Sequence, residues 1–131
     1  MVWQISSGIK ISVVPSYEGN YLQNNRLHYA FGYQITIENL SNDTVQLESR
    51  HWDIYDSLHH KDEVDGEGVV GEQPVIRPGG SHDYVSGCPL PTPHGSMEGH
   101  YDFRRADGTM MQVAIPFFPL AAPAQMHNRL H

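Results

Sequence analysis

The glycines at positions 66, 68 and 71 have a spacing that often accompanies phosphate chemistry. The string Gly66-Glu67-Gly68-Val69-Val70-Gly71 matches G-x-G-x-x-G. In dinucleotide-binding folds this motif follows a strand and opens a helix whose N-terminus holds the pyrophosphate. Here Pro78 and the glycines after it leave no room for a helix of useful length. The spacing therefore does not predict a dinucleotide-binding fold.

Two other uses of these glycines remain open. They can supply positive φ in a turn, or let the chain pass closely over a neighbouring strand. Alternatively, their backbone amides form a nest that grips a small anion such as pyrophosphate or a nucleotide. The nest needs a nearby cation, because seven of the 15 acidic residues lie between positions 53 and 72, where Lys61 is the only fixed cation. The candidate anion-binding residues are Gly66, Gly68, Gly71, Arg50 and Arg77.

Cys88 is the only cysteine, so the chain makes no internal disulfide, as expected in a reducing compartment. His82 and His94 are near it in sequence, but a nucleophile and its base are brought together by the fold and not by sequence distance. A small buried cysteine is the commoner case, and a catalytic thiol needs a depressed pKa. No other catalytic pattern is present, so we expect no catalytic residues and no enzyme.

Histidines and carboxylates are frequent, but their spacing matches no known metal motif. Adjacent residues on a strand point to opposite faces, so His59 and His60 would chelate poorly. The acidic residues between 62 and 67 do not have the spacing of a calcium loop, and no cluster has zinc-ligand spacing. We therefore predict no metal site and no cofactor, beyond a weak cobalt or nickel site formed by His127 and His131.

The net charge of −7, from 15 acidic and 8 basic residues, excludes general binding to nucleic acid or anionic membranes, which relies on a basic face. The N-terminus lacks the basic and apolar regions of a signal peptide. The longest apolar stretch, 113–124, contains three prolines and is well short of the ~20 residues that span a bilayer. We expect one cytoplasmic domain, 1–131, with a loosely held tail from about 121.

Apolar residues alternate with a period of two, which indicates strands. The clearest run puts six apolar side chains on one face, at positions 27, 29, 31, 33, 35 and 37. A change of phase after Leu47 predicts a β-bulge near Ser49 or Arg50. Asp107-Gly108 predicts a hairpin turn before a last strand, 109–117, that places Phe117 on the buried face.

No window has sustained helical periodicity, and turn signals recur every 8 to 15 residues. This pattern predicts an all-β fold: an antiparallel β-sandwich of seven or eight strands. In such a fold most aromatic residues belong to the core. If Phe117 and Phe118, which have opposite parity, are not both buried, an apolar patch results. An exposed edge strand beside such a patch favours protein–protein pairing or a homodimer.

Four strings together resemble the ApaG family, in this order and at these separations: Ser49–Trp52, Gly66–Pro74, Ser86–Leu90 and Gly95–Met97. The resemblance runs from about Gly8 to Leu120 and implies an immunoglobulin-like or fibronectin type III-like sandwich. It also implies a link to cobalt tolerance and magnesium efflux. Eukaryotic relatives carry the domain in F-box proteins and in a DNA-polymerase-delta-interacting protein, which implies a protein-binding module. The glycine string is the family's suspected phosphate or nucleotide contact.

These observations favour a non-enzymatic binding module that engages an unidentified protein partner through an edge strand and loops. A homodimer through the same kind of edge is an alternative arrangement. The alternative function is binding of a small phosphate-containing ligand, pyrophosphate or a nucleotide, by the loop from Gly66 to Gly71 with Arg50 or Arg77.

Overall fold

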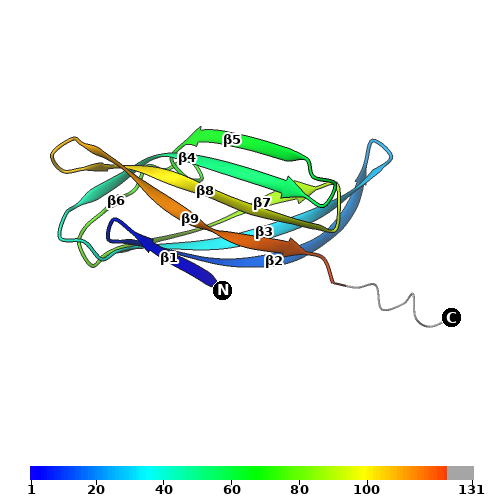
Figure 1. Cartoon of the computed structure of the whole chain (residues 1–131), viewed down its shortest axis with the longest axis horizontal. Helices are drawn as coiled ribbons and strands as arrows, with labels where there is room; N and C mark the ends of the chain where they lie inside the picture. Colours follow the sequence, from blue (N-terminus) through cyan, green and yellow to red (C-terminus); the bar gives the residue numbers. More distant parts are fainter. Residues whose placement is uncertain (124–131) are drawn as a thin grey trace.

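The computed structural model describes residues 1–123, and these form nine β-strands and no helix (Figure 1). The strands are β1 (Val2–Ser6), β2 (Ile9–Gln23), β3 (Arg26–Asn39), β4 (Val45–Asp56), β5 (Lys61–Glu67), β6 (Val75–Ile76), β7 (Ser81–Leu90), β8 (His94–Arg105) and β9 (Met110–Ala121). All the pairings between them are antiparallel. The predicted all-β class is confirmed: Val70 and Gly71 form a turn, and the chain after Gly71 continues into the short strand β6, as expected for a sequence that leaves no room for a helix there. Residues 1–123 contain no helix long and apolar enough to cross a bilayer.

The strands form two sheets that pack face to face (Figure 1). One sheet has the order β1-β2-β3-β7, and the other has the order β5-β4-β8-β9 with the short β6 paired to β4. Alternate side chains of both sheets point into the space between them and form a single core. Its largest fully buried side chains include Tyr101, Phe103 and Phe118. The period-two pattern of the sequence therefore corresponds to the inner faces of a β-sandwich.

The structure has more strands than the seven or eight predicted, and the physical reason is visible at the sheet edges. β1 is a sheet edge whose five residues are only partly buried or exposed. β5 is also an edge strand, and six of its seven residues are exposed. A strand that buries neither face has no need for alternating apolar residues. For this reason the polar sequence 61–67 gave no strand signal.

Two β-bulges shift the registers around β8. The predicted bulge lies between Leu47 and Ser49 of β4, next to the predicted positions. A second bulge, which was not predicted, shifts the β8–β9 register between Met97 and Gly99. It changes the phase of β9, so that Phe118 is fully buried and Phe117 is 56% exposed. The prediction that Phe117 faces the core is therefore wrong, because a bulge moves later residues to the other face.

The two lateral sides of the sandwich differ. On one side β9 packs against β1 and β2, and the Ala114 amide donates a 2.9 Å hydrogen bond to Ser6 Oγ. On the other side β5 and β7 are the sheet edges. Beyond β9, the Ala122 amide donates to the Pro93 carbonyl at 2.8 Å. Most of the expected loose tail, and with it His127 and His131, lies in residues 124–131, outside the described residues.

Candidate functional site

The side of the sandwich between β4–β5 and β7 contains two pockets of about 230 and 190 Å³, which we together call the inter-sheet cleft. Both pockets include Arg50 in their lining, so its side chain lies where they meet. Strands from both sheets contribute to the walls. The lining residues are Tyr33, Arg50, Trp52, Ile54, Val64, Val69, Val70, Tyr84, Ser86, Gly87, Cys88, Pro89 and Met97.

Aromatic side chains from the core form part of this lining and pack against one another. The ring centroids of Tyr33 and Trp52 are 5.3 Å apart, and each lies 5.9 Å from the ring of Phe118. Tilted and edge-on contacts of this kind are favourable for aromatic pairs. The cleft therefore has a preformed apolar wall built from both sheets.

Arg50 faces inward from β4 and connects that strand to the glycine string. It pairs with the fully buried Tyr101 of β8, which places both side chains on the inner face. Its Nη1 donates to the carbonyl of Glu67 at 3.0 Å and to that of Gly68 at 2.8 Å. A Cβ on Gly66 would lie 2.7 Å from the guanidinium group. Glycine at position 66 thus makes room for the Arg50 side chain.

The other two glycines belong to a tight turn that follows β5. Val69 and Glu72 exchange two backbone hydrogen bonds, of 2.8 and 3.0 Å. The residues between them, Val70 and Gly71, have φ of 47° and 77°, and positive φ at both central positions is typical of a type I′ turn. Gly68 has φ of 59°, and a Cβ there would lie 2.1 Å from the Glu72 carbonyl oxygen. These two glycines therefore supply positive φ, and Gly68 also permits a close backbone approach.

The structure brings together four of the five candidate anion-binding residues: Gly66, Gly68, Gly71 and Arg50. Arg77 is separate. It follows Ile76, which pairs with Val45, and Val45 is five positions before Arg50 on β4, or about 17 Å of extended strand. Two amides of the glycine string are also already used, since the Gly68 amide donates to Glu48 and the Val69 amide to Glu72.

Cys88 is almost fully buried in the wall of the cleft, and its surroundings favour the neutral thiol. Burial raises its pKa to about 11, and the negative charge of Asp62 contributes to the increase. Burial also raises the pKa of Tyr101, whose hydroxyl hydrogen-bonds to that of Tyr84. Among the described residues that line the cleft there is no histidine, aspartate or glutamate. The lining supplies shape, apolar surface and one cation, and no ionised nucleophile or carboxylate base.

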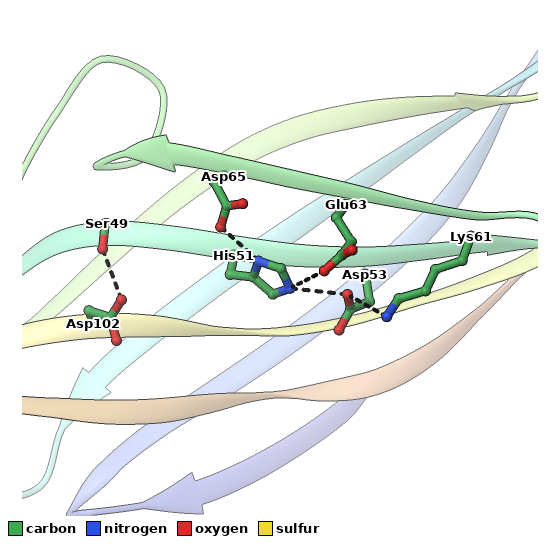
Figure 2. Close-up of polar contacts among 7 residues, drawn as sticks. All are labelled: Ser49, His51, Asp53, Lys61, Glu63, Asp65 and Asp102. Atoms are coloured by element: carbon green, nitrogen blue, oxygen red, sulfur yellow. Dashed lines mark hydrogen bonds and ion pairs between the residues drawn. The ribbon is translucent and has the colours of Figure 1, made fainter.

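A second group of polar side chains lies on the outer face of β4 and β5 (Figure 2). We call it the His51 cluster; it consists of His51, Asp53, Lys61, Glu63 and Asp65. His51 Nδ1 is 2.7 Å from Asp65 Oδ1, and its Nε2 is 3.0 Å from Asp53 Oδ1. The same Nε2 lies 3.7 Å from Glu63 Oε1, and Lys61 Nζ lies 3.4 Å from Asp53 Oδ1.

Charged neighbours in the His51 cluster shift the pKa values of His51 and Asp53. The hydrogen bond to Asp65 is the largest cause that raises the pKa of His51, and the bond to Asp53 adds to it. Desolvation opposes ionisation of Asp53, but its hydrogen bonds to His51 and Lys61 outweigh this and lower the pKa of its carboxyl. The cluster thus favours a positive charge at the imidazole.

Sequence reasoning missed the His51 cluster because it did not recognise β5 as a strand. His51 and Asp53 are two apart on β4, and Glu63 and Asp65 are two apart on β5. The hairpin pairs His51 with Asp65 and Asp53 with Glu63. Alternating polar residues on both sides of a short turn were the signal that could have revealed this shared face.

Comparison with known proteins gives consistent results. The family model described as the ApaG domain matches residues 19–105. A protein of Brucella suis biovar 1 (strain 1330), named Protein ApaG, is 46% identical over 121 residues, covering 92% of this chain and 93% of that protein. A protein of the same name from Methylobacterium sp. (strain 4-46) is 47% identical over 116 residues, covering 88% and 89%.

Solved structures with the same fold are also similar in sequence. The crystal structure of an ApaA protein from Bordetella pertussis is 37% identical, with a TM-score of 0.79, and the match covers 94% of this chain and 97% of that one. The X-ray structure of a structural-genomics target is 38% identical, with a TM-score of 0.86 and coverage of 92% and 91%. The names of these relatives and structures state no catalysed reaction.

Proposed function

Since the chain belongs to the ApaG family, we propose that it is a non-enzymatic binding module that engages a partner protein at the inter-sheet cleft. The observation that carries this proposal is the position of the cleft. It lies between β5 and β7, two edge strands whose outer edges have no partner strand within residues 1–123. Edge strands offer free backbone hydrogen-bonding groups, and adding an extended peptide to such an edge is a common mode of recognition.

The chemistry of the cleft favours an extended peptide segment. Arg50 Nη1 donates hydrogen bonds to the Glu67 and Gly68 carbonyls. These are the only hydrogen bonds that the Arg50 side chain makes within residues 1–123. A guanidinium group has five N–H donors, so the remaining donors are free for a peptide carbonyl. The apolar wall formed by residues such as Val64 and Met97 suits an aliphatic side chain.

The charge of the neighbouring edge indicates the composition of the partner. β5 carries four carboxylates and one lysine along seven residues, and the whole chain has a net charge of −7. Basic residues beside the inserted side chain would face this acidic edge and accelerate association. The proposed occupant is thus an extended segment with an apolar anchor flanked by lysine or arginine.

Val70 supports an interaction role for the turn after β5. It is 63% exposed at one end of the cleft, and it has a φ of 47°. A β-branched residue is strained at positive φ, and strained positions with exposed side chains often belong to functional sites. An exposed valine at this position presents apolar surface to a bound partner.

The test is a selection of peptides from a random library on the immobilised full chain, followed by NMR mapping of the peptides retained. We expect amide shifts along β5 and β7 and enrichment of basic residues around one apolar position. Val64→Lys places a cation in the cleft and is expected to weaken binding at least roughly tenfold, since like charge and lost apolar contact both oppose the peptide.

The matched control is Val14→Lys, because Val14 is a similarly exposed strand valine that does not line the cleft. Equal loss of binding in both variants, or shifts confined to other surfaces, would contradict the proposal. Sedimentation distinguishes a foreign partner from a second copy of this chain. A homodimer through β5 or β7 would sediment as a dimer, and Val64→Lys would dissociate it into monomers. A chain that binds no peptide and remains a monomer would also refute the proposal.

A small phosphate-containing ligand is the second candidate function. One observation favours it: the free donors of Arg50 lie close to the turn, and the Gly71 amide makes no backbone hydrogen bond among the described residues. Titration with pyrophosphate should then shift the Val70 and Gly71 amides, and Arg50→Lys should abolish the shifts. Pyrophosphate that shifts no amide of this turn at millimolar concentration removes this candidate.

A further inference from the structure

We propose that His51, Asp53 and Glu63 form a binding site for a divalent transition-metal ion of the zinc type. The site lies on the outer face of β4 and β5 (Figure 2), and none of its three residues lines the inter-sheet cleft. Each residue offers one ligand atom, and the three atoms lie within 4.8 Å of one another. The pairing of two neighbouring strands brings them together: Asp53 lies opposite Glu63, and His51 is two residues away on the same face.

The distances match the geometry of a small coordination shell. Zinc binds imidazole nitrogen and carboxylate oxygen at about 2.0–2.2 Å, so two ligand atoms in a tetrahedral shell are about 3.4 Å apart. Here His51 Nε2 lies 3.0 Å from Asp53 Oδ1 and 3.7 Å from Glu63 Oε1. These two separations bracket the tetrahedral value.

The hydrogen bonds of His51 place its Nε2 beside carboxylates, where a positive charge is favourable. Both ring nitrogens face carboxylate oxygens, at 2.7 Å for Asp65 and 3.0 Å for Asp53. A neutral imidazole has only one N–H. When Nδ1–H donates to Asp65, the lone pair of Nε2 points at the carboxylates of Asp53 and Glu63. Either a second proton or a metal ion removes this repulsion, and an ion also neutralises both carboxylates.

Asp65 gives His51 the support that metal-binding histidines usually have. Ligating imidazoles commonly donate their second N–H to a carboxylate, which fixes the tautomer and the ring orientation. The bond from His51 Nδ1 to Asp65 provides this arrangement. The ring of His100 stacks on that of His51, with centroids 5.0 Å apart, and further restricts its rotation. Nε2 is thus held toward the two carboxylates.

The donor set indicates which ions fit. One nitrogen and two carboxylate oxygens suit zinc and neighbouring first-row divalent ions. Magnesium and calcium prefer shells made only of oxygen. Soft ions prefer thiolate, and Cys88 is buried in the core. Three protein ligands leave a position open for water or for a ligand from a partner molecule.

Lys61 provides a test with the opposite sign. Its Nζ lies 3.4 Å from Asp53 Oδ1, so it competes with an ion for that carboxylate. Removing a ligand and removing the competitor must therefore change the affinity in opposite directions. If zinc were only attracted nonspecifically to the acidic edge, Lys61→Ala would change the zinc affinity no more than removal of another lysine or arginine.

The experiment is calorimetric titration of the full chain, freed of metal by chelation, with zinc chloride. We expect one ion per chain, weakened at least roughly tenfold by Asp53→Asn and by Glu63→Gln, and by roughly 10–100-fold by Asp65→Asn. Lys61→Ala should bind zinc more tightly than the unmodified chain. Excess magnesium should not displace zinc, and the ring-nitrogen NMR signal of His51 should move on binding.

Two controls keep the result specific. Asp102→Asn removes a carboxylate of β8 that accepts a 3.0 Å hydrogen bond from Ser49 Oγ and lies outside the proposed site, and it should leave zinc affinity unchanged. The double variant His127→Ala, His131→Ala tests the remaining histidines near the chain end. Absence of stoichiometric binding, unchanged affinity in Asp53→Asn and Glu63→Gln, or loss only in the double variant would overturn the proposal. Because both carboxamide variants are isosteric, circular dichroism should confirm that they fold.

Discussion

We expect Gly68→Ala to destabilise the protein more than Gly71→Ala, although both glycines have positive φ. Their φ values are 59° and 77°. A left-handed conformation costs an alanine about 1–2 kcal/mol, and this cost applies to both substitutions. The reduced freedom of the unfolded chain offsets it by about 0.4–1 kcal/mol in both cases. The two variants therefore share their conformational cost and differ only in their contacts.

The contacts differ strongly. A Cβ on Gly68 would lie 2.1 Å from the Glu72 carbonyl oxygen, whereas a Cβ on Gly71 would have no atom of residues 1–123 within 4 Å. The Glu72 carbonyl also accepts the Val69 amide, and Val69 accepts the Glu72 amide in return. Relief of the clash separates these residues and breaks both bonds, each of which contributes about 0.5–1.5 kcal/mol. Gly68→Ala should thus cost about 1–3 kcal/mol more than Gly71→Ala.

Urea denaturation followed by circular dichroism measures this difference, provided that the two variants unfold with the same m-value. Hydrogen exchange at the Val69 amide provides a local readout, because opening of the turn exposes it. Equal free energies of unfolding for the two variants would show that Gly68 does not pack against the Glu72 carbonyl. The steric explanation of the glycine string would then be wrong.

Four further outcomes are expected. Val70→Asn should raise the free energy of unfolding by about 1 kcal/mol, because asparagine tolerates the positive φ of a type I′ turn. Urea denaturation measures this gain, and no gain would show that Val70 is unstrained. Asn39→Ala should lower the free energy of unfolding by at least about 1–3 kcal/mol, because the buried side chain donates to the Ile76 carbonyl at 3.0 Å. A smaller loss would show that water replaces the side-chain amide. The pKa of His51 is raised, and the groups that face it are Asp53, Glu63, Asp65, Lys61 and His100. Its contribution to the stability of the folded protein is therefore complete below about pH 6.5, and it declines as pH rises through the folded-state pKa. Denaturation of unmodified protein and His51→Gln should therefore converge at alkaline pH, and a constant difference contradicts this. Cys88, with a pKa of about 11, should be alkylated more slowly than a model thiol at pH 8 until the protein is unfolded, and fast alkylation of the folded chain would contradict its burial.

The interior of the sandwich could be predicted because burial itself creates the pattern. Ile9, Ile11 and Val13 alternate with polar residues since one face of β2 is covered by the opposite sheet and the other is not. The turn at Asp107-Gly108 was also predictable, because Gly108 has a φ of 88°, which glycine adopts without strain. Local steric requirements and periodic burial leave signals within a few residues of sequence.

Register shifts could not be predicted with the same accuracy. The change of phase after Leu47 revealed one bulge, because apolar residues on both sides of it are buried. The bulge in β9 is less evident, since Pro116 and Phe118 are both buried on either side of the exposed Phe117. Three neighbouring apolar residues are compatible with either phase, so the sequence alone did not decide which phenylalanine enters the core.

The two candidate sites were hidden for a different reason: their chemistry is distributed between strands whose pairing is not local information. Arg50 could be paired with the glycine string from the sequence, but Arg77 could be included just as well. The β4–β5 register places Arg50 beside Gly66, and the β4–β6 register places Arg77 near the other end of β4. The same register places Asp53 opposite Glu63 and gives His51 a carboxylate on each ring nitrogen. A shift of β5 by one residue would turn Glu63 and Asp65 to the other face of the sheet. Because the metal proposal depends on this register and the cleft does not include these carboxylates, failure of zinc binding would leave the peptide-binding proposal intact.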